Sequence, residues 1–172
     1  MLDPGVLTRS DALHARVQAA IAGSTGDRAL VWPDEEFESL ARDLFAHQVG
    51  GCDAYGHYCR VRGVLPSSLP SWRAIPAVPT EVWKAVDLFA FPTAAATAVF
   101  QTSGTTVGTR GRHLLRRTDT YEASLAGPFD RFLGGGRPRI LVLAPDAAEA
   151  PDSSLSFMLR WAVDSRGGPG SG

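Results

Sequence analysis

The chain has 172 residues, 44% of them hydrophobic, and a formal net charge of −1 at pH 7. This length is typical of one domain, and this apolar content is sufficient for a sizeable core. The near-neutral charge argues against general binding to nucleic acid or to an anionic membrane. No stretch approaches the roughly 20 apolar residues that span a bilayer, and charged residues stand where a signal peptide would be apolar. We therefore expect a cytoplasmic protein with no membrane span.

The first third of the chain has the periodicity of helices. Ser10 suits the N-cap of a helix on which Leu13, Val17 and Ile21 share one face. In the next helix Asp34 is the expected cap, and its acidic first turn suits the positive end of the helix dipole. The predicted helices cover residues 10–22, 34–49 and 54–62.

A proline-rich segment follows these helices. The prolines between residues 65 and 79 forbid a regular helix and favour an extended path. We expect Trp72 to attach this path to the core and Thr80 to begin a short helical turn. Residues 1–92 are thus predicted to form a helical N-terminal segment with a proline-rich approach.

Two cysteines and two histidines lie close together in this segment. Cys52 and Cys59, with His47 and His57, do not complete any standard zinc-binding spacing. Two cysteines also do not make a disulfide framework. We therefore predict no metal site.

Residues 93–166 alternate between strand and helix patterns. The apolar runs at 97–102 and 140–144 predict strands, the second of them buried, and residues 113–116 predict a short strand that leads away from the loop. Helices are predicted at 119–132 and 153–165. This order predicts a partial, mainly parallel α/β sheet in which 97–102 and 139–144 are neighbours or lie one strand apart. Residues 167–172 are glycine-rich and predict a flexible tail, and we expect a single truncated domain.

The clearest functional pattern follows the first of these strands. Small hydroxyl residues and glycines leave backbone N–H groups free and let an anion approach closely, as in a phosphate cradle. Their spacing fits neither the Walker A loop nor the dinucleotide fingerprint. On these residues alone, a simple turn between two strands remains the alternative. The candidate phosphate-binding residues are Thr102, Ser103, Gly104, Thr105, Thr106 and Gly108, with positive charge from Arg110 and Arg112.

The run Thr-Ser-Gly-Thr-Thr at 102–106 resembles the phosphate loop of the adenylate-forming enzymes. With residues 111–121, 75–84 and 152–158, it is similar to the acyl-protein synthetases of bacterial bioluminescence and their relatives. The chain departs from the family where a lysine usually follows the loop, because Arg110 stands there. The resemblance covers essentially the whole chain but only the first half of the family's length.

The resemblance implies an incomplete adenylate-forming fold. It also implies the N-terminal part of an ATP-dependent ligase that activates a carboxylic acid, above all a fatty acid, as acyl-AMP for transfer to a thiol. The cofactors would be ATP and Mg²⁺, held mainly by residues outside this chain, and the acceptor a thiol or a reductase partner. Arg110 or Arg112 would replace the missing lysine, and His113 would border the acyl pocket. The alternative is a truncated, non-catalytic remnant that binds a phosphate compound or a partner chain through an exposed sheet edge.

Overall fold

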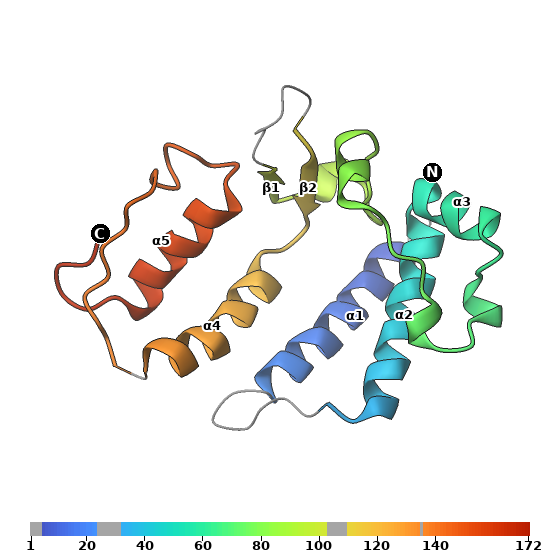
Figure 1. Cartoon of the computed structure of the whole chain (residues 1–172), viewed down its shortest axis with the longest axis horizontal. Helices are drawn as coiled ribbons and strands as arrows, with labels where there is room; N and C mark the ends of the chain where they lie inside the picture. Colours follow the sequence, from blue (N-terminus) through green and yellow to red (C-terminus); the bar gives the residue numbers. More distant parts are fainter. Residues whose placement is uncertain (1–4, 24–31, 103–109, 135) are drawn as a thin grey trace.

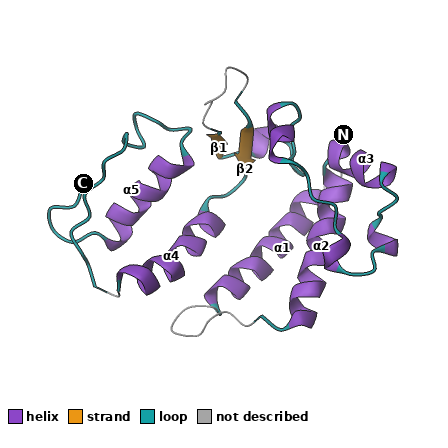
Figure 2. Ribbon diagram, viewed as in Figure 1, coloured by secondary structure: helices purple, strands orange, loops and turns teal. Residues whose placement is uncertain are grey.

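The structure, a computed structural model, describes residues 5–23, 32–102, 110–134 and 136–172. Helices α1, α2 and α3 lie on one side of a short hairpin, and α4, α5 and the C-terminus lie on the other (Figures 1 and 2). Four short 3₁₀ turns lie between α3 and β1. The elements are α1 Gly5–Ala22, α2 Asp34–Gly51, α3 Asp53–Val61, β1 Ala98–Gln101, β2 Arg112–Leu115, α4 Asp119–Leu133 and α5 Ser154–Arg166.

The predicted helices are all found, but α1 begins at Gly5, so Ser10, its expected cap, lies within the helix. Residue Ser153 caps α5, since its hydroxyl accepts a hydrogen bond from the N–H of Ser156 at 3.1 Å. At α2 the cap position belongs to Pro33, and the expected cap, Asp34, is the first helical residue. None of the described helices is both long and apolar enough to cross a membrane.

The predicted parallel sheet is wrong. In the described part of the chain the sheet has two strands, β1 and β2, which pair antiparallel with Ala98 opposite Leu115 and Gln101 opposite Arg112. The short connection between them permits a hairpin, whereas parallel strands need a longer crossover. The protein is therefore α/β in a coarse sense, rich in helix, with a small antiparallel sheet. The expected incomplete adenylate-forming fold is likewise not found in the described residues, because it requires the parallel sheet.

Residues 140–144 do not form the predicted buried strand beside β1. Their backbone pairs instead with the end of the chain: the N–H of Val142 donates to Gly172 O at 2.9 Å, and the N–H of Gly172 donates to Ile140 O at 3.0 Å. The side chain of Leu141 is 64% exposed and that of Leu143 is 100% exposed. Residues 167–172, for which the sequence predicts a flexible tail, thus run alongside this apolar segment.

The main core lies between α2, α3 and the proline-rich path. Phe45 is 1% exposed and packs edge-to-face on Tyr55, with ring centroids 6.1 Å apart. The Tyr55 hydroxyl donates to Pro76 O at 2.9 Å and so attaches the path to α3. Burial raises the pKa values of Tyr55 and of the nearby Cys59 thiol. The buried members of this core are Phe45, Cys52, Tyr55, Cys59 and Leu69.

Two glycines at the end of α2 allow a matched test of this packing. A Cβ on Gly51 would lie 2.8 Å from the Cβ of Ala90, whereas a Cβ on Gly50 would meet nothing within 4 Å. We expect Gly51→Ala to lower the free energy of unfolding by about 1–3 kcal/mol through overpacking. Gly50→Ala should instead raise it by up to about 1 kcal/mol, because alanine favours helix. Urea denaturation of the two variants measures the difference, and equal effects would contradict the packing.

The carboxylate of Glu38 joins α2 to the proline-rich path. It accepts a hydrogen bond from the N–H of Trp72 at 3.1 Å and another from Arg42, and these lower its pKa, the Trp72 bond most. A pKa that is lower in the folded state gives stability that is present above the ordinary value of 4.5 and is lost as the pH falls through the folded value.

We therefore expect Glu38→Gln to destabilise the protein at neutral pH and to have a smaller effect in acid. Denaturant titrations at several pH values measure whether the free energies of unfolding of Glu38→Gln and the unsubstituted protein approach each other in acid. Glu36→Gln, at an exposed position on the same helix, is the control. A Glu38→Gln deficit that does not change with pH would contradict it.

Candidate functional site

The base of the hairpin connection is closed by Thr102, Arg110 and Gly111. The N–H of Thr102 donates to Gly111 O at 2.9 Å, and the N–H of Gly111 donates to the Thr102 hydroxyl at 2.9 Å. The Arg110 Nε donates to Thr102 O, also at 2.9 Å. The structure therefore brings together the residues at both ends of the predicted phosphate loop.

The predicted phosphate-binding residues Ser103, Gly104, Thr105, Thr106 and Gly108 lie outside the described residues. The described part of the site consists of the hairpin base, β1 and β2, and the segments that pack against them.

Each of the two predicted cations forms an ion pair. Arg110 Nη1 lies 2.7 Å from Asp152 Oδ2, and Arg112 Nη2 lies 2.8 Å from Asp87 Oδ2. All four side chains are partly exposed, so each pair contributes little to stability and can open for an anion of higher charge. The sequence identifies the arginines but not these partners, which are 42 and 25 residues away.

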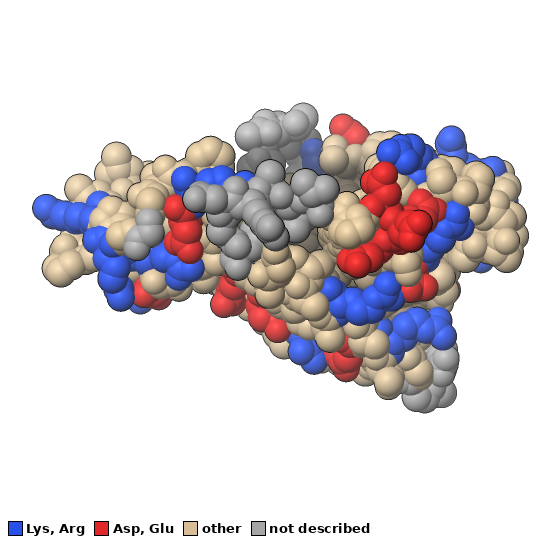
Figure 3. Space-filling view, turned by 90° about the horizontal axis from the view of Figure 1, so that it is seen from below, with Lys and Arg blue, Asp and Glu red and all other residues tan. Residues whose placement is uncertain are grey.

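Surface charges elsewhere are mixed as well. Figure 3 shows acidic and basic side chains next to one another over the face that it presents. This agrees with the net charge of −1, and that face therefore has no extended electrostatic potential of one sign.

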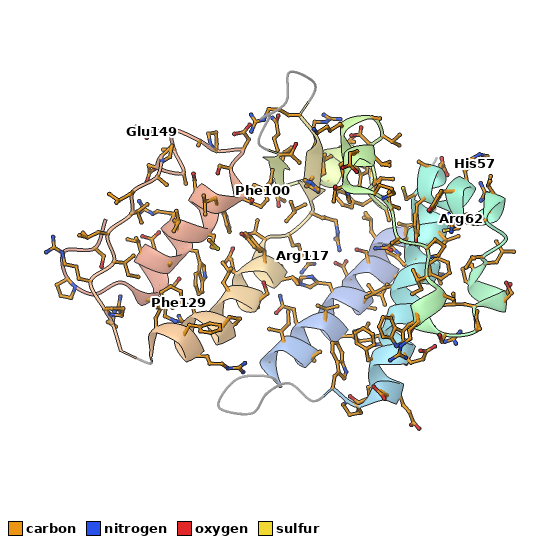
Figure 4. All side chains as sticks on the ribbon, viewed as in Figure 1. His57, Arg62, Phe100, Arg117, Phe129 and Glu149 are labelled. Carbon is orange, nitrogen blue, oxygen red and sulfur yellow. The ribbon has the colours of Figure 1, made fainter. Side chains whose placement is uncertain are left out.

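His113 stacks on Trp83 and borders a cavity. The two ring centroids are 4.3 Å apart, with 38° between the planes. The cavity has a volume of about 400 Å³, and its lining includes Phe100 and Tyr121 as well as the stacked pair. Phe100 is buried at the centre of the molecule, where Figure 4 labels it. In the sequence, only the family resemblance associates these residues with one another.

A larger cavity of about 540 Å³ adjoins the first. The two cavities share Trp83, Leu88 and Leu114 in their linings. The walls of the larger one are mainly aromatic and aliphatic, with His47, Gln48 and Cys52 as polar groups. This volume and this mixture are typical of sites that bind small molecules.

The imidazole of His47 is a titratable group that lines the larger cavity. Burial lowers the pKa of its imidazole, and the positive charges of Arg9 and Arg116 lower it further. The ring is therefore neutral at pH 7, with one nitrogen as donor and the other as acceptor. The sequence predicts no metal at His47, and we find no group of three or more metal-ligating side chains in the described ranges.

A hydrogen-bonded chain between α1 and α4 was missed by sequence reasoning. The Thr120 hydroxyl lies 3.0 Å from His14 Nδ1, and His14 Nε2 lies 3.0 Å from Asp119 Oδ2. A hydroxyl, an imidazole and a carboxylate in this order also occur in hydrolases. Neither cavity described above is lined by these residues, so we assign the chain to helix packing. Arg117, labelled in Figure 4, adds an ion pair to Asp11 of α1 at 2.8 Å.

Comparison with known proteins returned no match among family models, curated proteins or solved structures.

Proposed function

We propose that the chain is the N-terminal part of an ATP-dependent acyl ligase that activates a fatty acid. In the reaction, a carboxylate oxygen attacks the α-phosphorus of ATP and pyrophosphate leaves. A thiol sulfur then attacks the carbonyl carbon of the acyl-AMP, and AMP leaves. The observation that carries the proposal is the apolar cavity of about 540 Å³, which adjoins the hairpin bearing the predicted phosphate loop.

The hairpin supports the phosphate part of the proposal. Residues 103–108 would hold the β- and γ-phosphates of ATP, positioning them and neutralising their charge. Arg110 and Arg112 follow these residues, and one of them would exchange its carboxylate partner for a phosphate oxygen. When bound, Mg²⁺ would neutralise phosphate charge, with ligands mainly from a second half of the enzyme.

The cavities support the acid part. A hydrocarbon chain in the larger cavity would lie against Trp83 and Leu114 and lose its contact with water. Leu114 belongs to β2, so part of such a chain would lie beside the hairpin.

The alternative is a non-catalytic chain that binds a phosphate compound or a partner chain. The exposed side chains of Leu141 and Leu143 favour the partner-chain version, because exposed apolar surface often marks a protein–protein contact.

Binding of decanoate to this chain tests the acid site directly. We expect saturable binding that changes the fluorescence of Trp83, and loss of that change in Trp83→Phe. Leu114→Trp, which fills the space shared by the two cavities, should weaken binding at least about tenfold, or about 1.4 kcal/mol. Leu155→Trp is the matched control at an exposed position on α5. Undiminished binding to Leu114→Trp would contradict the site.

A further inference from the structure

Residues 139–143, here called the edge segment, lie outside β1 and β2 and bond to the C-terminal tail along one edge. The N–H of Ile140 donates to the Ser171 hydroxyl at 3.0 Å, and the groups of Ile140 and Val142 bond to Gly172 on the same side. In an extended chain the N–H and C=O of successive residues point to opposite edges. The backbone groups of Leu141 and Leu143 therefore point away from the tail, and neither makes a backbone hydrogen bond within the described part of the chain.

The side chains of the edge segment also have one covered face and one open face. Val142 is half-buried and, with Leu159 and Val163 of α5, borders a small cavity of about 140 Å³. Leu141 and Leu143 are exposed, Leu143 completely. Figure 1 places this segment beside the C-terminus at one end of the molecule, away from β1 and β2. An open edge that carries exposed leucines is a template for a further strand.

The charges on either side of the edge segment have opposite signs. Arg137 and Arg139 precede its centre, and their guanidinium groups donate to the tail carbonyls of Gly167 and Gly170. Asp146 and Glu149 follow it, and Asp146 lies 3.8 Å from Arg160. Figure 4 labels Glu149 on the loop after the segment. A second copy that pairs antiparallel brings the basic end of each segment beside the acidic end of the other. Parallel pairing would place like charges together, which is unfavourable.

We propose that the edge segment pairs antiparallel with the edge segment of a second copy of the chain, about a two-fold axis at Val142. This register puts Leu141 opposite Leu143 of the second copy, and Leu143 opposite its Leu141. Both residues present their N–H and C=O to the partner, so the two pairs exchange four hydrogen bonds. The same patch serves both copies, as a two-fold dimer requires. The inference goes beyond the proposed ligase function and does not depend on it.

The dimer is weak, because the pairing covers only a few residues on each side. Stable interfaces bury about 1,200–2,000 Å² in total, and a short strand pair with two leucines from each copy covers less. We expect a dissociation constant on the order of 10–100 µM.

Sedimentation equilibrium over a range of concentrations tests the dimer. The unsubstituted chain should show reversible dimerisation, and Leu141→Lys and Leu143→Lys should each weaken it more than tenfold. Circular dichroism and thermal unfolding of these variants should be unchanged, because both side chains are exposed. Leu133→Lys, at an exposed position on α4, is the matched control and should dimerise normally. A chain that remains monomeric at every concentration overturns the proposal.

Cysteine cross-linking tests the register. Directly opposed residues have Cα atoms about 5.5 Å apart, within reach of a disulfide, whereas residues offset by two are about 7–8 Å apart and are not. A mixture of Leu141→Cys and Leu143→Cys proteins should therefore form a mixed disulfide, and neither protein alone should cross-link. The unsubstituted chain gives the background, since Cys52 and Cys59 are buried. Cross-linking of each variant with itself, without a mixed product, would show parallel pairing and overturn the proposal.

Discussion

Replacing both Thr105 and Thr106 with alanine is expected to abolish most acid-dependent exchange of labelled pyrophosphate into ATP. The assay requires a ligase in which this chain is joined to a complete C-terminal half. Each hydroxyl would donate to charge that develops on the transferring phosphates. By analogy with the loss of one oxyanion donor, each substitution should lower turnover about a hundredfold or more.

Thr93→Ala is the matched control, because Thr93 is exposed in the turn before β1 and lies outside the loop. It should leave exchange unchanged, and none of the three substitutions should alter the unfolding midpoint by much. A double variant with undiminished exchange would remove the phosphate-loop assignment. For the 172 residues alone we expect weak exchange or none.

The same assay can distinguish the contributions of Arg110 and Arg112. Arg110→Ala leaves Asp152 without its cation, and Arg112→Ala leaves Asp87 without its cation. Besides removing positive charge, each variant thus exposes a carboxylate that would repel phosphate. The arginine that replaces the family's lysine should cost far more activity than the other.

The helices could be predicted from the sequence because their signals are local. In α2 the acidic first turn and the periodic apolar residues lie within one segment, and the Ser153 cap of α5 acts three residues away. The attachment of the proline-rich path to the core was also expected, and Trp72 does pack on Phe37 of α2 with ring centroids 5.0 Å apart.

The pairing of strands could not be predicted because it depends on distant residues. The run 140–144 has the composition of a buried strand, but composition does not say which segment pairs with it. Its partner is the end of the chain, where glycines carry no strand signal, and β1 pairs instead with β2. The antiparallel hairpin pairs two strands that are close in the sequence, and the alternation of strand and helix does not indicate such a pair.

In the described part of the candidate site, too, local features could be predicted and contacts between distant residues could not. Thr102, Arg110 and His113 were identified from a contiguous motif, whereas their surroundings come from other segments. Trp83 is 30 positions from His113, and His14 meets Thr120 across 106 positions. Such contacts are determined by the packing of whole elements, so the cavities could not be read from the chain.

Phe45→Ala is expected to lower the free energy of unfolding by about 3–5 kcal/mol. Phe45 is 1% exposed at the centre of the buried cluster and contacts the ring of Tyr55. Its removal leaves a cavity among α2, α3 and the proline-rich path, which can collapse only partly. Few other residues of the described chain are as deeply buried, so one side chain carries a large share of the packing.

Phe132→Ala makes the same chemical change at a side chain that is 82% exposed on α4, and it should alter the free energy of unfolding by less than about 0.5 kcal/mol. Guanidinium denaturation of both variants, followed by circular dichroism, provides the comparison. A similar loss in both would mean that the core does not lie where the structure places it. If Phe45→Ala also weakens decanoate binding while Phe132→Ala does not, the cavity beside Tyr55 depends on the integrity of this core, because Tyr55 and Cys52 belong to both.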